Sequence, residues 1–161
     1  MNRPSISEAE RFSFTPRPVP VPGDLRINWR VSIVLLMLKS CRSNRASFAK
    51  LHLLNDAVRS EQSSRKIERI LVGQEDMLSW RMRVEPAFGR AIDFAVGDKF
   101  AGWTRTAQKA GLQLTKDGIA AAQSIERADD VLLVEKAFIR SLAKQITEEF
   151  VTKILGGQRS R

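Results

Sequence analysis

Residues 100–126 (FAGWTRTAQKAGLQLTKDGIAAAQSIE) restrict the fold of this chain more than any other stretch, because two strand patterns run directly into a helix. Residues 101–107 alternate and carry Trp and Thr, which suit a pleated, half-buried strand. Residues 108–111 supply a polar turn in which Gly111 is free to take a positive φ, and the alternation then resumes. Thr115 stands where the N-cap of the following alanine-rich helix belongs. The stretch therefore predicts a β-hairpin followed at once by a helix.

A helix is also predicted immediately before this hairpin, over Pro86–Gly97, with Pro in its first turn and Gly at its end. Residues 76–84 (DMLSWRMRV) alternate between apolar and polar with a period of two, which predicts a further strand that pairs with the hairpin. Helix, hairpin and helix in this order predict a winged-helix domain over residues 27–127. Such a domain binds DNA or only protein, because a fold does not fix a function.

Three more helices are predicted in the first half of that domain. Residues 27–41 are the most apolar, and their length and Leu and Met content favour a buried helix with Asn28 as its cap. Ser47 is predicted to cap a second helix over residues 48–59, which has one apolar face. After a polar turn, residues 64–72 are predicted to form the third helix.

Residues 1–26 are predicted to form a proline-rich N-terminal arm. Four prolines at alternate positions block a helix and favour an extended path. One interpretation is a flexible tail. The other is a strap that lies on a partner, with Phe12 and Phe14 as anchors.

Residues 128–161 are predicted to hold one long amphipathic helix, over residues 131–155, and a basic tail. A helix of this length spans ~37 Å, which is more than a small domain covers. It either packs back on its own domain or offers its apolar face to a partner or a second copy. Four large side chains mark that face: Phe138, Leu142, Ile146 and Phe150.

The composition is that of a globular domain. A chain of 161 residues that is 43% apolar can bury a real core, and its net charge of +9 predicts contact with something anionic. The single cysteine, Cys41, leaves no internal disulfide and indicates a reducing compartment. The longest apolar run, residues 33–38, is far shorter than the ~20 residues of a membrane span. We therefore expect a soluble, cytoplasmic protein without membrane contact.

Catalytic chemistry has little support in the sequence. The lone histidine, His52, lies inside a predicted helix, where packing explains it better than catalysis or metal binding. No second cysteine or histidine adjoins Cys41, and no glycine-rich phosphate loop is present. We therefore expect no enzyme activity, no cofactor and no metal site.

A sequence-specific DNA reader is also weakly supported. The predicted recognition helix over Pro86–Gly97 carries Arg90 and Asp93, with Asp98 just after it, whereas phosphate contacts need Lys and Arg. The hairpin carries Arg105 and Lys109, which are the candidates for phosphate or minor-groove contact. The other positive charges are spread along the chain and are interpreted as solvated faces.

Residues 27–127 contain the helix pattern NWRVSIVLLML, the turn CRSNRAS and the helix pattern FAKLHLLNDAVRS. In these stretches the chain resembles the middle component of bacterial ABC-three-component systems, which include the Lamassu type of phage and plasmid defence. The resemblance extends to AVGDKFAGW and GLQLTKDGIAAA in the hairpin region. Where members of that family often carry a Trp before the closing Ala-x-Arg, this chain has Asp56.

The resemblance implies a non-catalytic adaptor subunit. Its implied partners are an SMC-like ATPase and an effector subunit, often a nuclease, with DNA reached through the complex. Its implied task is to couple the sensing of foreign DNA by the ATPase to the effector. We expect His52, Asn55 and Arg59 on or near the docking surface, while internal hydrogen bonding is the alternative for Asn55 and Arg59. The alternative function is a dimeric winged-helix DNA-binding transcriptional regulator that dimerises through residues 131–155.

Overall fold

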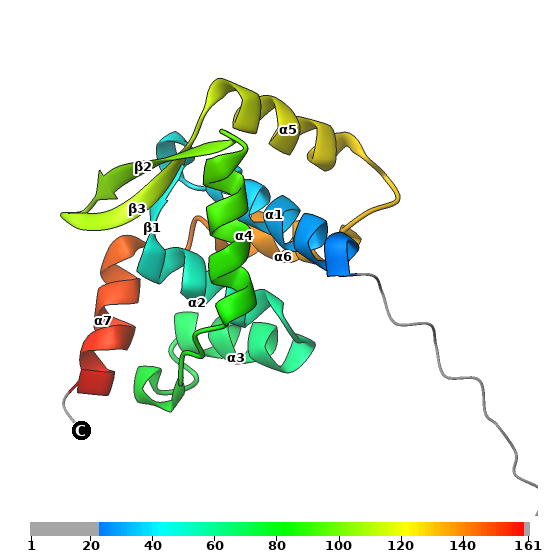
Figure 1. Ribbon diagram of the computed structural model, residues 1–161. Helices are drawn as coiled ribbons and strands as arrows, with labels where there is room; N and C mark the ends of the chain where they lie inside the picture. The colour runs from blue at the N-terminus through cyan, green and yellow to red at the C-terminus, as the bar shows by residue number, and fades with distance from the viewer. Residues whose placement is uncertain (1–22, 160–161) are drawn as a thin grey trace, which may run out of the picture.

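The computed structural model of the chain describes residues 23–159. This part of the chain is mainly helical with one small antiparallel sheet, as the sequence predicted (Figure 1). The helices are α1 Gly23–Ser40, α2 Phe48–Val58, α3 Glu61–Leu71, α4 Pro86–Gly97, α5 Lys116–Arg127, α6 Leu133–Leu142 and α7 Glu148–Arg159. The strands are β1 Arg45–Ser47, β2 Ala101–Thr106 and β3 Lys109–Leu114, and two short 3-10 turns are η1 Arg42–Asn44 and η2 Met77–Ser79. None of the described helices combines the length and the apolar character that crossing a bilayer requires. The predicted arm anchors, Phe12 and Phe14, lie outside the described residues.

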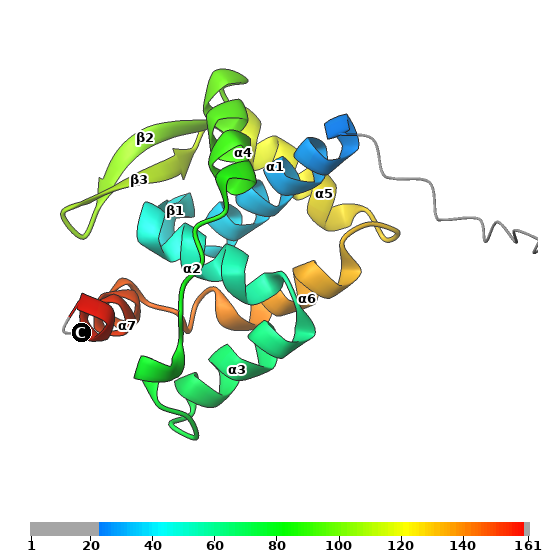
Figure 2. The ribbon, with the colours of Figure 1, turned by 60° about the horizontal axis from the view of Figure 1, so that its bottom comes forward.

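Helix α1 is the centre of the core. Six consecutive residues, 33–38, are buried on every side, so this helix needs neighbours all around it. It contacts α2, α4, α5 and α6, which surround it in Figures 1 and 2. The helix begins at Gly23, so Asn28 lies inside it and is not its cap, and the helix extends into the predicted arm.

The sheet has the strand order β1-β3-β2, with both pairs antiparallel. Ala46 of β1 and Trp103 of β2 both lie opposite Leu112, so β3 is the central strand. The prediction of a strand over residues 76–84 is wrong, since this segment forms η2 and irregular chain. The strand that pairs with the hairpin is instead β1, which follows η1 directly and lies along the second edge of β3.

The hairpin turn differs from its prediction by a few residues. The central turn residues are Ala107 and Gln108, both with positive φ (50° and 62°), and Gly111 lies inside β3. Glycine is required at position 111 for a different reason. A Cβ atom there would lie 2.2 Å from the backbone oxygen of Ala46, so only glycine allows β1 to pack this close.

The predicted helix caps are largely confirmed. The side chain of Ser47 accepts a hydrogen bond from the Lys50 amide, and that of Thr115 accepts one from the Gly118 amide. Helix α3 begins earlier than predicted, because Ser60 caps it and the segment predicted as a polar turn forms its first turn.

The prediction of one long C-terminal helix over residues 131–155 is wrong. The chain forms α6 and α7 instead, with a break over residues 143–147. Thr147 accepts a hydrogen bond from the Phe150 amide at 3.1 Å, which starts a new helix with Glu148 and Glu149 in its first turn. The break returns α7 to the hairpin side of the molecule, while α6 packs on α1 and α2 (Figures 1 and 2).

Candidate functional site

The three α2 residues expected at a docking surface have different environments. Asn55 is only 4% exposed, and its Nδ2 donates a hydrogen bond to Oε2 of Glu85 at 3.3 Å. Arg30 of α1 donates to the other oxygen of the same carboxylate. Arg59 is partly exposed, with its Nη2 3.6 Å from Oδ1 of Asp56. Asn55 therefore joins α2 to the start of α4 inside the fold, and of the three only Arg59 lies largely at the surface.

His52 is a packing residue in this structure. Its ring is half-buried and meets the edge of the Phe88 ring, with the centroids 5.1 Å apart. Burial lowers the pKa of His52, so the imidazole is neutral near pH 7. Its Nδ1 is buried and has no hydrogen-bond partner among the described residues.

The Glu85 carboxylate is held in its charged form. Burial raises its pKa, but hydrogen bonds from Arg30 and Asn55 and the charges of Arg30 and Arg59 outweigh burial and hold the pKa below its ordinary value. This carboxylate therefore serves as an internal link between α1, α2 and α4.

The C-terminal residues expected to meet a partner belong to the chain's own core. Phe138, Leu142 and Ile146 are buried and Phe150 is partly buried against the core. The helix that was expected to expose an apolar face thus packs back on its own domain, which is the other interpretation of the pattern. The exposed apolar side chains in this region lie at the start of α6: Val131, Leu133 and Val134.

Helix α4 exposes a surface with few cations. Its exposed residues include Arg90, Asp93 and Phe94, and Phe94 is 48% exposed although it is a large apolar side chain. Asp98 follows at the end of the helix and is also exposed. With the exposed Lys99 beside Asp98, the charges of this face balance, and the face exposes one large aromatic side chain.

The two hairpin cations are not equivalent. Arg105 in β2 is exposed, whereas Nζ of Lys109 donates a hydrogen bond to Oγ1 of Thr152 in α7 at 2.6 Å. Trp103 of β2 stacks at a tilt on Phe48, with the ring centroids 5.1 Å apart. The hairpin is therefore held against α2 and α7, and of its two predicted nucleic-acid contacts only Arg105 is unengaged within the described chain.

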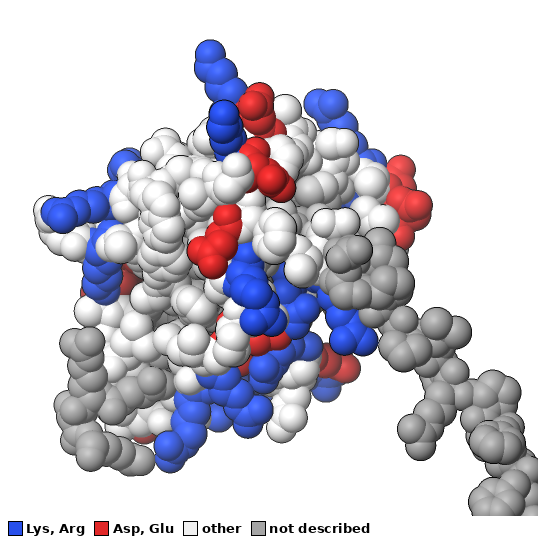
Figure 3. Space-filling model, in the orientation of Figure 1, with Lys and Arg blue, Asp and Glu red and all other residues white. Residues whose placement is uncertain are grey.

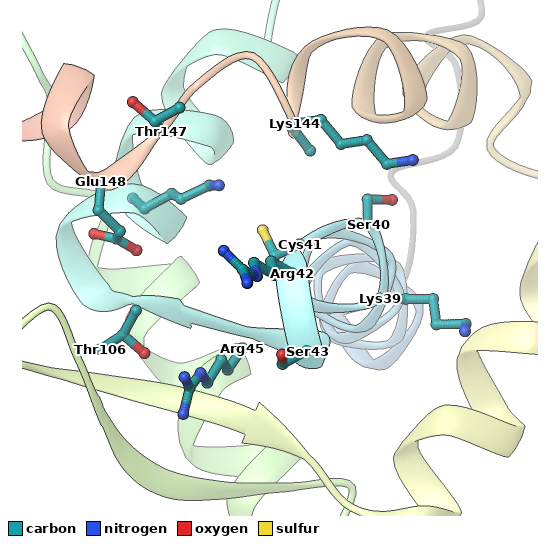
Figure 4. Close-up of a pocket in the computed structure, with 12 residues that line it drawn as sticks. Lys39, Ser40, Cys41, Arg42, Ser43, Arg45, Thr106, Lys144, Thr147 and Glu148 are labelled. Atoms are coloured by element: carbon teal, nitrogen blue, oxygen red, sulfur yellow. The ribbon is translucent and has the colours of Figure 1, made fainter.

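A hollow of about 840 Å³ lies between the end of α1, η1, β1 and the link from α6 to α7 (Figure 4). We call it the basic pocket, because five cationic side chains and one carboxylate line it. The cations are Lys39, Arg42, Arg45, Lys50 and Lys144, and the carboxylate is that of Glu148. In Figure 4 the guanidinium group of Arg42 reaches toward the space between Cys41 and Glu148, whereas Lys39 and Lys144 extend toward the opposite side of the view.

Glu148 connects the end of the chain to the start of α2. Its Oε1 accepts a hydrogen bond from the Ser47 amide at 2.9 Å, and its Oε2 accepts one from the Ser47 hydroxyl at 2.6 Å. A carboxylate at a helix N-terminus satisfies free amide groups and is favoured by the helix dipole. The bond fixes the wall of the basic pocket that α7 provides.

Two further groups in the basic pocket are largely buried. Lys50 is 7% exposed and lies beside Cys41. Burial raises the pKa of the Cys41 thiol, against the opposing effect of the Lys50 ammonium group, so the thiol is protonated near pH 7. Cys41 is thus an inert lining residue, and Lys50 is the buried charge of the pocket.

Sequence reasoning missed the basic pocket. Its cations were interpreted as solvated faces, and the residues that form it come from segments about 100 positions apart, as in the Ser47–Glu148 pair. One local signal was present: Thr147 followed by two glutamates is typical of a helix start, and it marks the break that brings Glu148 to Ser47.

Comparison of the chain with protein-family models, with curated proteins and with solved structures gives no match. We therefore infer its function from the arrangement of its residues.

Proposed function

We propose that residues 27–127 form a winged-helix domain that acts as a protein-binding adaptor. The order of elements supports the fold: α1, the short strand β1, α2, a further helix α4 and the hairpin β2–β3. The strand that follows the first helix pairs with the second strand of the hairpin, and this order, β1-β3-β2, also supports the proposed fold. Helix α3 and η2 form an insertion between α2 and α4.

The main support for an adaptor function is the composition of the exposed surface of α4. A helix that enters a DNA groove needs cations for the backbone and amide or guanidinium groups for the bases. Helix α4 instead exposes Phe94 beside Asp93, with Arg90 as its one exposed cation. An exposed aromatic side chain with a charged surround is typical of a protein interface.

Together with the resemblance of residues 27–127, this surface leads us to a specific proposal. The chain is a non-catalytic subunit of an SMC-like ATPase defence complex of the ABC-three-component, Lamassu-type class. It couples DNA sensing by the ATPase to an effector such as a nuclease. The docking face on this chain is α4 around Phe94, and Arg59 lies at a second accessible position.

Co-purification of the tagged protein from its native host, with the bound proteins weighed by mass spectrometry, tests the proposal. We expect a large ATPase with coiled-coil mass and a second subunit. Phe94→Ser should release them, whereas Val72→Ser removes an even more exposed apolar side chain at the end of α3 and should not. Recovery of the protein alone, or equal effects of the two substitutions, would contradict the adaptor function.

A DNA-binding regulator is the second candidate, because one surface is strongly basic. Arg59, Lys66, Arg81 and Arg83 line one shallow hollow, and Figure 3 shows Lys and Arg side chains gathering around the lower end of α4 and over α3. A dimeric regulator would have to pair through residues that remain exposed, such as Leu133 and Val134, since the large apolar side chains farther along α6 are buried. Duplex binding that falls steeply with salt and weakens on substitution of Arg105 would favour this candidate. Flat fluorescence anisotropy at about 100 mM salt would exclude it.

A further inference from the structure

We propose that the basic pocket binds the terminal phosphates of a nucleotide-sized di- or triphosphate. This inference does not depend on the adaptor function, since the basic pocket lies at the end of α1 and not on α4. Nor does it depend on any resemblance, because it rests on the charges, burial and volume of the pocket.

The charge of the basic pocket is unbalanced. Five cationic residues and a single carboxylate line it, so the lining carries an excess of four positive charges, although Lys39 and Lys144 extend away from Glu148 in Figure 4. No ion pair joins any of these five cations to an acidic residue within the described part of the chain. The carboxylate of Glu148 is itself engaged by the amide and hydroxyl of Ser47. A cluster of like charges held together in this way is stabilised by an anion.

Lys50 distinguishes this pocket from an ordinary basic surface. Lys50 is only 7% exposed, and it lies beside the Cys41 thiol, which also senses the charge of Glu148. A buried ammonium group is costly to fold unless an opposite charge balances it. Glu148 is the one acidic residue of the lining and is already bonded to Ser47, so a bound anion would repay part of that cost. Oγ1 of Thr106 lines the same pocket and is buried without a hydrogen-bond partner among the described residues. A phosphate oxygen would supply the partner that this hydroxyl lacks.

The position of Lys50 favours a terminal phosphate over the backbone of a nucleic acid. Arg42, Arg45 and Lys144 are exposed, so a duplex passing over the surface can reach them. Lys50 is accessible only to a group that enters the hollow, which a phosphodiester within a duplex cannot do. The hollow of about 840 Å³ also falls in the size range of small-molecule sites, roughly 300–1,000 Å³. Arg42, whose guanidinium group reaches toward the space between Cys41 and Glu148 in Figure 4, is placed to bind the phosphate there.

The first test is isothermal titration calorimetry of the full chain with ATP, pyrophosphate and inorganic phosphate at constant ionic strength. We expect ATP and pyrophosphate to bind more tightly than phosphate, because they engage more of the cations. Arg42→Gln should weaken ATP binding by about 10- to 100-fold, the value of one charge-assisted hydrogen bond or bidentate pair. Arg127→Gln removes one charge from the exposed end of α5, away from the pocket, and should leave the affinity within about twofold.

A second test removes the negative charge of the basic pocket instead of a positive one. Glu148→Gln keeps an oxygen acceptor for Ser47 but removes the one negative charge, so it should tighten ATP binding several-fold. Glu149→Gln changes the next residue, which is exposed and faces its own Lys153, and should have no effect. Lys50→Met should abolish binding, and its far-UV circular dichroism shows whether the variant is folded. If it is not folded, the ATP affinities of Lys144→Gln, in the pocket lining, and of the exposed control Lys116→Gln are compared instead.

A duplex of about 20 base pairs is titrated in parallel to separate the two sources of phosphate. ATP binding that is lost in Arg42→Gln and gained in Glu148→Gln, with duplex binding indifferent to Lys50, supports the proposal. Absence of ATP and pyrophosphate binding overturns it. The proposal is also overturned if the pocket variants and the control variants lose the same ATP affinity. It is overturned as well if duplex binding requires Lys50 as strongly as ATP binding does.

Discussion

At the scale of single residues, Glu148 is the most consequential side chain that the sequence did not reveal. Replacing it with Ala removes two hydrogen bonds from Ser47, one of them from a backbone amide at the start of α2. We expect Glu148→Ala to lower the free energy of unfolding by about 1–3 kcal/mol, measured by urea denaturation. Glu149→Ala changes an exposed neighbour whose ion pair contributes little, so its effect should stay below about 0.5 kcal/mol. Equal effects of the two substitutions would show that the Ser47 contact does not stabilise the fold.

Glu85 gives the chain a pH-dependent contribution to stability. Its folded-state pKa is held below its unfolded value, so its contribution is complete above the unfolded pKa of about 4.3 and is lost as the pH falls through the folded value. Glu85→Gln should therefore be less stable than the parent chain at neutral pH, and the difference should close in acid. Denaturation midpoints at pH 7 and near pH 3 measure this. Glu68→Gln, an exposed change on α3, is the control, and a difference that persists unchanged at low pH would contradict the assignment.

At the scale of elements, the close contact between β1 and β3 depends on the lack of a side chain at Gly111. Gly111→Ala would place a methyl group 2.2 Å from the Ala46 oxygen, so a backbone shift is required. We expect a loss of about 1–3 kcal/mol in the free energy of unfolding. Gly102→Ala in β2 meets nothing within 4 Å and should change stability by less than half as much in the same denaturation series.

The hairpin turn is strained, because two non-glycine residues in it have positive φ, and residues that favour this conformation would relieve the strain. Ala107 and Gln108 both have positive φ, which costs a non-glycine residue of this kind about 1 kcal/mol. The double substitution Ala107→Asn with Gln108→Gly supplies the sequence preferred by such two-residue turns. It should raise the thermal midpoint by about 2–4 °C per kcal/mol gained. A lowered midpoint would indicate that Gln108 has a role beyond the turn.

Elements with local signals were predictable and elements with tertiary causes were not. The starts of helices α2, α4 and α5 are predictable from Ser47, Pro86 and Thr115, because each residue acts within one turn of its helix. Strand β1 has three residues and no pattern of its own, because only its pairing with β3 makes it a strand. Residues 76–84 show the opposite case, since a strict alternation does not by itself form a strand. This segment stays outside the sheet although the outer edge of β2 pairs with no strand of the described chain.

The candidate site was less predictable than the fold for the same reason. The basic pocket is assembled from α1, η1, β1 and the link between α6 and α7, and it exists because the predicted long helix breaks at Thr147. An unbroken helix would have carried Glu148 away from Ser47. The apolar periodicity that predicted one helix runs through both helices, so it could not locate the break, whereas the cap signal at Thr147 could.

At the scale of the whole molecule, α7 is part of the fold and not an appendage. Val151 and Ile154 are fully buried, which contributes about 1.5–3 kcal/mol each, and Glu148 adds its bonds to Ser47. Ending the chain after residue 146 should therefore remove roughly 5 kcal/mol, a large part of the 5–15 kcal/mol that holds a typical domain. We expect the truncated chain to melt broadly or not cooperatively by circular dichroism. Within the full chain, Ile154→Ala should be strongly destabilising and the exposed Lys153→Ala nearly neutral, and a truncated chain with a sharp parental transition would contradict this.

The bond between Lys109 and Thr152 has a mechanical consequence. It joins the tip of the hairpin to α7, while Glu148 joins the same helix to the start of α2. Tension applied to α7, whether from a fused tag or from a bound neighbour, would therefore act on the hairpin and on α2 together. Detaching α7 would remove both bonds and, with Glu148, one wall of the basic pocket.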